Sequence, residues 1–302
     1  MKFLHECVRR IDQGLTLDPD QQRFVRVGAA ELSIQARTRW AQWDLELSQQ
    51  GHSRLYGELA DLARDEIGNK RVVNFFYMHK PPGMRLRFEF EHQAFCEERQ
   101  LLQHSLTRLI NRLRSTDVSI ECRPSFYEPE QHLFGGPSSM RHVHALSTVD
   151  SLAWLEYLAA ARRSGPAWAF SLGLLRGVLD GLQVVGWEDL DMWDRVRRQT
   201  HRALPASVLA TTSFTEAAAG IRSIWKSGSA SAQHSRGITG LAVDEIRNAA
   251  ADWLAGYFRT ADAYVGPREA AAFFTIFHWN RGRISGWQQA LITEALVDRS
   301  AL

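Results

Sequence analysis

The spacing of apolar residues in the first half of the chain switches between two periods. Thr38–Leu47 carries tryptophan and leucine at alternate positions, which predicts a β-strand. Arg54–Ile67 and Glu97–Arg114 repeat leucine every three or four positions, which predicts amphipathic helices. A further strand is expected over Val118–Phe126. With the hairpin described next, this order indicates an α+β fold, with a mixed sheet and crossover helices in the N-terminal half.

The stretch from Arg71 to Glu91 reads as two strands joined by a proline-glycine turn. Its first part is almost wholly apolar, and its second part alternates strictly between apolar and charged residues. The alternation places Arg85 and Arg87 on one face, about 7 Å apart. Two interpretations follow: a solvated face balanced by neighbouring glutamates, or a pair of cations that binds an anionic or carbonyl-rich ligand.

From Val149 onward the apolar spacing is helical, so the C-terminal half is predicted to be mostly helical. The small-residue segment Lys226–Gly240 interrupts it and is expected to be a loop. Residues 1–36 form a predicted N-terminal extension, a candidate for homodimerisation or peptide binding, and residues 37–302 form one predicted domain. Asp150-Ser151, just before a helical pattern, is interpreted as a helix cap.

Composition and missing motifs exclude several classes of function. The 302 residues carry a net charge of +2, which argues against nucleic acid or an anionic membrane as the main partner. Three cysteines without CxxC spacing give no zinc signature, and the chain lacks a signal-peptide pattern and a long apolar run, so a cytoplasmic protein is expected. Nucleotide-binding and metallohydrolase motifs are also missing. We therefore expect neither a metal nor an organic cofactor.

Two further segments carry candidate site residues. In the loop-like segment Pro124–Gly136, Tyr127 and Glu130 are polar groups suited to a bound peptide, and Gly135 and Gly136 permit close backbone approach to a ligand. The alternative is that Tyr127 packs in the core and Glu130 caps a helix or pairs with an arginine.

Near the C-terminus, His278, Asn280 and Arg281 set a titratable group beside an amide and a permanent cation. Such a set is suited to acid/base chemistry with an oxyanion donor. A histidine near a helix C-terminus is also often structural.

Three motifs in order carry a resemblance to a known family. FFYMHKPPGMRLRF resembles a segment written FFIRY-x-dP-x-x-H-L-R-L-R; YEPE and FGGP follow, with His144 and Asp150-Ser151 beyond them, and FHWNR lies near the end. The chain from about Trp40 onward is similar to the thiopeptide-type bacteriocin biosynthesis domain, which is also the C-terminal elimination domain of lantibiotic dehydratases.

The resemblance implies one of two reactions. Eliminating members expel glutamate from a glutamylated precursor peptide to leave a dehydroamino acid. Stand-alone relatives join two dehydroalanines in a formal aza four-plus-two cycloaddition, lose water and the leader peptide, and form a pyridine. Eliminating members have arginine, tyrosine, histidine and arginine where this chain has Leu133, Phe134, Met84 and Met78.

These replacements favour a pyridine synthase, or macrocyclase. The resemblance then implies catalytic roles for Arg85, Arg87, His278, Asn280 and Arg281, with Arg85, Arg87 and His278 facing one cavity. The expected partners are the leader and core of a dehydrated, azoline- or azole-containing precursor peptide, and tRNA is not expected. Two alternatives stay open: a glutamate-eliminating subunit of a split dehydratase, or a non-catalytic precursor-binding scaffold.

Overall fold

The computed structural model describes residues 2–47, 53–91, 94–114, 120–160, 165–231 and 238–297. Its sheet has four strands in the order β2-β3-β1-β4, each paired antiparallel with its neighbours. The N-terminal half thus consists of β1 (Thr38–Leu47), α3 (Ser53–Gly68), β2 (Asn74–Lys80), β3 (Gly83–Glu91), α4 (Phe95–Arg114) and β4 (Ile120–Ser125). This is a ferredoxin-like βαββαβ arrangement. The predicted α+β class is confirmed, although the described sheet is antiparallel throughout rather than mixed.

The strict alternation along β3 separates two faces of the sheet. Met84, Leu86, Phe88 and Phe90 are at most 1% exposed. They lie on the α4 side, because Trp43, opposite Leu86 in the register, donates a hydrogen bond from its indole to Gln103 of α4. The charged residues of β3 therefore project from the other face of the sheet.

The two edges of the sheet are protected in different ways. The outer N–H groups of Phe75 and Tyr77 on β2 donate to the hydroxyls of Thr148 and Ser151, at 3.1 and 3.3 Å. At the opposite edge, Arg114 donates to the carbonyl oxygen of Ile120, and Pro124 on β4 has no N–H. Both arrangements reduce the number of free edge groups available for pairing with another strand.

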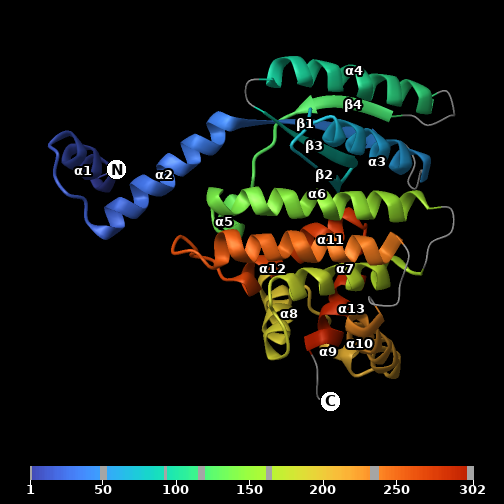
Figure 1. The fold of residues 1–302 in the computed structure, drawn as a ribbon. Helices are drawn as coiled ribbons and strands as arrows, with labels where there is room; N and C mark the ends of the chain where they lie inside the picture. Colours follow the sequence, from blue (N-terminus) through green and yellow to red (C-terminus); the bar gives the residue numbers. More distant parts are fainter. Residues whose placement is uncertain are drawn as a thin grey trace.

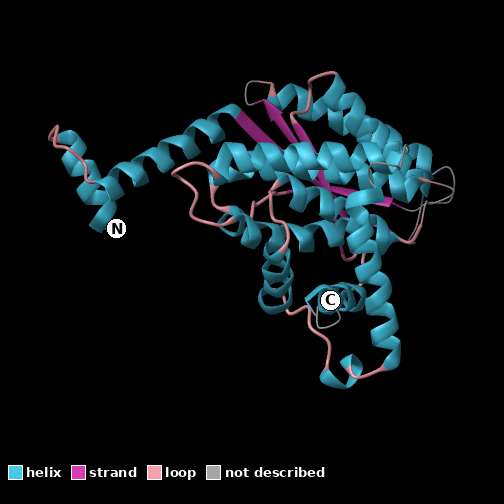
Figure 2. Ribbon diagram, turned by 60° about the horizontal axis from the view of Figure 1, so that its bottom comes forward, coloured by secondary structure: helices cyan, strands magenta, loops and turns pink. Residues whose placement is uncertain are grey.

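The C-terminal half is helical, as predicted. Figure 1 shows α6 running beneath the sheet, with α11, α12 and α7 below it and α8, α9, α10 and α13 farther down. Figure 2 shows the same elements turned. Its elements are α5 (Gln131–Phe134), α6 (Pro137–Ala159), α7 (Ala167–Gly181), α8 (Trp187–Gln199), α9 (Ala206–Leu209), α10 (Thr212–Ser231), α11 (Ile238–Trp253), the π-helix η1 (Leu254–Phe258), α12 (Pro267–Arg281) and α13 (Gly286–Val297).

Three helix boundaries differ from the predictions. Helix α6 begins at Pro137 rather than near Val149. The loop expected over Lys226–Gly240 is wrong at both ends, since α10 continues to Ser231 and α11 starts at Ile238. Residues 232–237 of that segment lie outside the described residues.

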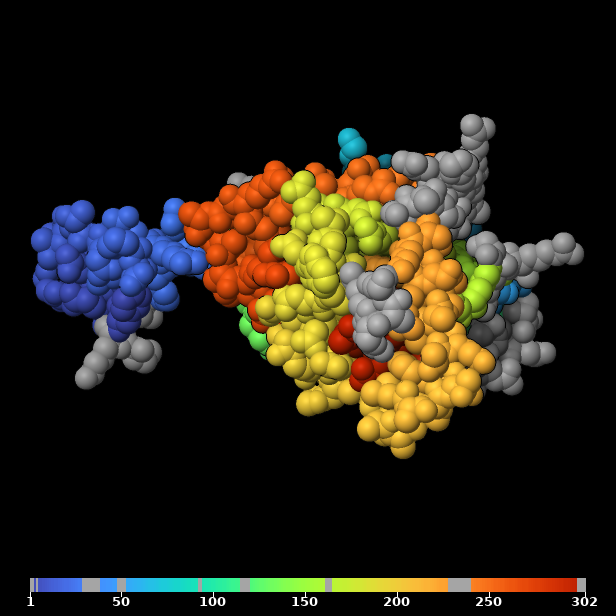
Figure 3. Space-filling view, turned by 90° about the horizontal axis from the view of Figure 1, so that it is seen from below, coloured from blue at the N-terminus to red at the C-terminus, as the bar shows by residue number. Residues whose placement is uncertain are grey.

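An arm formed by α1 (Lys2–Asp12) and α2 (Pro19–Arg37) projects from the body, as Figures 1 and 3 show. Phe3 and Phe24 contact each other edge to face at 5.5 Å and hold the two helices together. Arg26 reaches Asp262 of the body at 3.4 Å. The boundary between a 1–36 extension and a 37–302 domain stays a prediction. Within the described ranges, every helix is too short or too polar to cross a bilayer.

Candidate functional site

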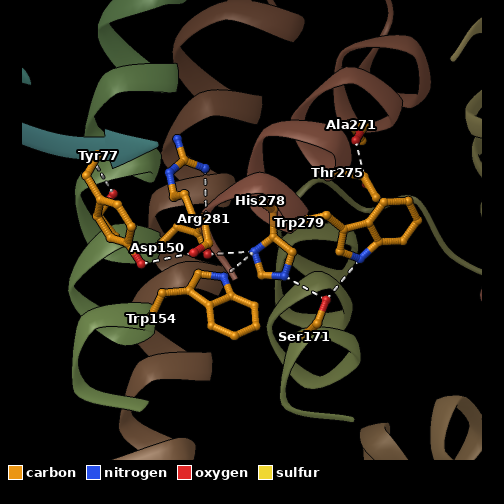
Figure 4. Close-up of polar contacts among 10 residues, drawn as sticks. Tyr77, Asp150, Trp154, Ser171, Ala271, Thr275, His278, Trp279 and Arg281 are labelled. Carbon is orange, nitrogen blue, oxygen red and sulfur yellow. Dashed lines mark hydrogen bonds and ion pairs between the residues drawn. The ribbon is translucent and has the colours of Figure 1, made fainter. Parts of the chain in front are cut away.

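A buried polar cluster joins the middle of α6 to the last turn of α12. His278 Nδ1 lies 2.7 Å from Asp150 Oδ1, and Arg281 Nη1 donates to Asp150 Oδ2 at 2.8 Å (Figure 4). His278 and Arg281 share a helix face because they stand three residues apart. The three side chains are at most 1% exposed. One carboxylate therefore holds both C-terminal site residues.

The ring of His278 is held on both nitrogens. Nδ1 also lies 3.2 Å from the indole nitrogen of Trp154, but a carboxylate accepts only, so the shorter Asp150 contact assigns the proton to Nδ1. Ser171 then donates its hydroxyl proton to Nε2 at 2.8 Å, and Trp279 donates to Ser171 Oγ at 3.1 Å. The order serine, histidine, aspartate resembles a hydrolytic triad. Ser171 is 0% exposed, however, so this cluster is sealed in the interior.

The interpretation of Asp150-Ser151 as a helix cap is wrong. Both residues lie inside α6, well past its start at Pro137, and both are buried. Asp150 instead pairs with α12, and Ser151 accepts the N–H of Tyr77. Their polar side chains are satisfied by other elements, not by the end of their own helix.

A second cluster surrounds Arg87 on the charged face of β3. Arg87 Nε donates to Gln42 Oε1 at 2.8 Å, and its guanidinium carbon lies 5.1 Å from the ring centre of Phe76 and 4.5 Å from that of Tyr127. Burial lowers the pKa of Arg87, while the neighbouring Tyr127 and Glu130 act in the opposite direction. The cluster is a desolvated cation between two aromatic rings.

His144 on α6 completes this second cluster. The Tyr127 hydroxyl and His144 Nε2 lie 3.0 Å apart, and the ring of Trp40 lies 4.4 Å from that of His144. Burial, and then the charge of Arg87, lower the pKa of His144 to about 3. Burial also raises the pKa of Tyr127. Both groups are neutral near neutral pH, so Tyr127 keeps its proton and remains a donor.

The two clusters meet at Phe76. The guanidinium carbon of Arg281 lies 5.8 Å from the Phe76 ring centre, against 5.1 Å for Arg87. Arg87 Nη1 and Arg281 Nε are both buried and have no hydrogen-bond partner among the described residues. Buried donors in native proteins are nearly always paired. Two unpartnered donors on neighbouring arginines therefore mark this junction as the candidate site.

The predicted site residues Arg85, Asn280 and Glu130 lie outside the two buried clusters. Arg85 lines a pocket of about 350 Å³ and pairs with Asp44 at 3.8 Å. Asn280 lines another pocket, of about 420 Å³. Glu130 directly precedes α5 without capping it by its side chain. His278 is sealed and Arg85 is partly exposed, so Arg85, Arg87 and His278 do not together line either of these pockets. Their shared cavity and catalytic roles stay a prediction.

Gly135 and Gly136 each lie close to a tyrosine side chain of the same protein. Gly135 and Gly136 have φ values of +95° and +83°, a region that favours glycine. A Cβ on Gly135 would overlap the hydroxyl of Tyr257, and one on Gly136 would lie 2.8 Å from that of Tyr264. The predicted role of the glycines in substrate binding stays a prediction.

The described residues contain no group of three or more histidine, cysteine, aspartate or glutamate side chains placed to hold a metal ion. The expectation that the protein works without a metal or cofactor stays a prediction. The arrangement defines a class: an α+β protein that buries arginine donors between a ferredoxin-like sheet and a helical half. Such a site is suited to holding carbonyl or carboxylate oxygens.

Comparison with known proteins identifies the family. The profile described as "Lantibiotic biosynthesis dehydratase C-term" matches residues 40–300, so the chain belongs to that family. The search of curated proteins gave no match. The match confirms the family resemblance and supports a role in modifying ribosomally made peptides.

Two solved structures share the fold at low sequence identity. One is the tRNA-dependent lantibiotic dehydratase MibB from Microbispora sp. 107891, with a TM-score of 0.57 and 13% identity over 85% of this chain. The present chain spans only 27% of that protein. The other is TsrL, with a TM-score of 0.50 and 13% identity over 88% of this chain and 95% of TsrL.

Proposed function

We propose that the protein is a pyridine synthase that joins two dehydroalanines of a modified precursor peptide by a formal aza four-plus-two cycloaddition, with loss of water and leader peptide. Family membership supports the peptide substrate. Apolar residues at the positions that are polar in glutamate-eliminating relatives support this reaction. Met84 is 1% exposed on the α4 side of β3, and Phe134 is 2% exposed against Trp253 and Phe277. Neither position offers a charge to a glutamyl carboxylate.

The observation that carries the proposal is the pair of unpartnered donors beside Phe76. A buried N–H without an acceptor costs about 1–3 kcal/mol, and a substrate oxygen at this place would recover that free energy. Asp150 neutralises Arg281, and the charge of Glu130 acts on Arg87. The junction is therefore suited to a polarised amide oxygen as well as to a full anion.

These donors fit the first step of the proposed reaction. One amide must tautomerise to an iminol, so that its oxygen gains a proton and its nitrogen loses one. Arg87 and Arg281 would stabilise charge on that oxygen. Tyr127, which keeps its proton, would supply the proton that the oxygen gains, and Glu130 would accept the proton that the nitrogen loses. Holding the two alkenes in contact would supply much of the remaining rate enhancement.

His278 acts in this proposal as a positioning residue. Because it is sealed between Asp150 and Ser171, it reaches the substrate only through Asp150, which fixes Arg281. Arg85 and Asn280, which line the two outer pockets, would contact flanking parts of the peptide.

The test is to incubate the protein with a dehydrated, azole-bearing precursor peptide and follow it by mass spectrometry. The expected product has lost water and the leader peptide. Arg87→Met should slow its formation, while Arg108→Gln, at an exposed side chain of α4, serves as the control. Recovery of unchanged peptide that still binds the wild-type protein would contradict the proposal and support a scaffold.

One observation favours glutamate elimination as the second candidate. Arg87 is buried with the neutral amide of Gln42 as its hydrogen-bond partner, and a buried cation favours an anionic ligand. A glutamylated precursor distinguishes the two reactions. Release of free glutamate with formation of a dehydroamino acid would support elimination, and release of water and leader from the dehydrated peptide would support cycloaddition.

A further inference from the structure

The pocket of about 420 Å³ lies between the β2–β3 turn and the end of α12. Leu47, Pro82 and Ile284 give it apolar walls. Its remaining described lining includes Asn280, the residue before Arg281 of the candidate site. A group bound here would therefore lie against the same end of α12 that supplies Arg281.

The charged residues in the described lining of this pocket are all positive. Lys80 and Arg283 both line it, and none of its described lining residues is acidic. The third titratable group, His79, is kept neutral because burial and the charge of Arg283 lower its pKa to about 3. The neighbouring pocket of about 350 Å³ differs, because it holds Asp44, Glu46 and Glu121 beside its cations. Only the first of these two pockets complements an anion.

Arg283 has a backbone conformation that glycine adopts readily. Arg283 follows α12 with φ +56°, in the left-handed region that favours glycine. The next residue is anchored, since Ile284 N–H donates to the carbonyl of Trp279 at 3.0 Å. Replacing Arg283 with glycine would therefore remove the cation without opposing the backbone conformation.

We propose that this pocket binds a carboxylate of the precursor peptide between Lys80 and Arg283, with an apolar neighbour of that carboxylate against Leu47 and Ile284. This inference rests on the proposed peptide substrate. The edge of β4 is poorly suited to pairing with a peptide strand, because Pro124 lacks an N–H and Arg114 occupies the carbonyl of Ile120. Recognition through a charged pocket does not need a free strand edge.

The probes are three short peptides titrated into the full chain. The first is acetyl-(Leu-Glu)₃ amide, the second is acetyl-(Leu-Gln)₃ amide, and the third is acetyl-(Leu-Gln)₃ with a free C-terminal carboxylate. Methyl NMR of Leu47 and Ile284 reports binding at the pocket walls. The expected result is binding by the first or the third peptide, but not by the second. Binding by the first indicates that the pocket holds a side-chain carboxylate, and binding by the third indicates a C-terminal carboxylate.

Two variants and two controls locate the binding. Lys80→Gln and Arg283→Gly should each weaken binding of the carboxylate-bearing peptide roughly tenfold, the loss of one charged contact. Gln183→Gly relieves a similar backbone conformation (φ +59°) away from the pocket. Arg108→Gln removes an exposed cation of α4 that is in the described lining of neither pocket. Neither control should change the affinity.

Equal binding of all three peptides, or equal affinity of Arg283→Gly and wild type, would overturn the inference. Comparing the unfolding temperature of Arg283→Gly with that of wild type separates lost binding from lost folding. The readout is binding alone. A protein that binds the acidic peptide but forms no pyridine would refute the proposed reaction and leave this site standing.

Discussion

The two buried clusters on either side of Phe76 contain the same kinds of groups but differ in how these groups are hydrogen-bonded and how their charges are balanced. Around His278, each ring nitrogen has a partner and Asp150 balances Arg281. Around Arg87, the hydrogen-bond partner is a neutral amide and one donor nitrogen has no partner among the described residues. Satisfied groups hold a structure together, whereas an unsatisfied donor is free for a ligand. The first cluster is thus mainly the support, although Arg281 Nε also has no partner among the described residues, and the second is the candidate for chemistry.

The largest effect is expected from removing the carboxylate of the support. Asp150→Ala leaves Arg281 buried and uncompensated, which should lower the free energy of unfolding by about 3–5 kcal/mol. Urea unfolding measures it. Asp44→Ala is the matched control, since Asp44 is 42% exposed and 3.8 Å from Arg85, and should cost at most about 1 kcal/mol. Equal losses for the two variants would remove the distinction between support and surface.

Arg87→Met should separate stability from function. Loss of a donor to the reacting oxygen should slow turnover by about 10²–10³-fold, as for removal of one oxyanion donor. The free energy of unfolding should stay the same or rise, because the variant also removes a buried cation whose hydrogen-bond partner is neutral. Arg281→Met should lower both the rate of turnover and the free energy of unfolding. Measuring initial rates and urea curves together checks this; a large loss of stability in Arg87→Met would assign Arg87 to the support.

The pKa of His144 predicts an acid dependence of stability. Burial lowers that pKa to about 3 from the ordinary 6.5, so in acid the unfolded chain binds a proton that the folded chain does not. Stability should be intact above pH 6.5 and fall toward pH 3, by up to about 1.4 kcal/mol per pH unit from this group. His144→Gln should flatten the slope of unfolding free energy against pH. The exposed His132→Gln is the control, and identical slopes for the two variants would contradict the assignment.

The smallest effect is expected at Ser171. Ser171→Ala removes the acceptor of Trp279 and one partner of His278, which should cost about 1 kcal/mol of unfolding free energy. Turnover per folded molecule should be unchanged, because His278 and Asp150 stand between the Ser171 hydroxyl and Arg281 in the chain of contacts. Complete loss of turnover in a stably folded Ser171→Ala would instead make Ser171 a nucleophile.

The sequence alone predicted the local features of the site well. Alternation along Met84–Glu91 placed Arg85 and Arg87 on one face, because period two is a direct consequence of strand geometry. It did not show that Arg87 is buried while Arg85 is partly exposed. That difference depends on Tyr127 and His144, which come from other parts of the chain and cover one end of the sheet.

Asp150 shows why the rest was missed. Its partners lie 128 and 131 residues away, so no local pattern indicates the pairing. The start of α6 was also misplaced, because the polar residues after Pro137 hide the helical period. Pro137 directly after Gly136 was the available signal, since proline is favoured in the first turn of a helix.

The hydrogen bonds from β2 to α6 constrain how the gene can change length. Thr148 and Ser151 stand nearly one helical turn apart and serve alternate residues of β2, while Asp150 between them reaches α12. One inserted codon in this turn would rotate every later residue by about 100° about the helix axis. The hydroxyl of Ser151 and the carboxylate of Asp150 would then leave their partners at the same time. Insertions and deletions among descendants of this gene should therefore accumulate in the loops and be absent from the middle of α6.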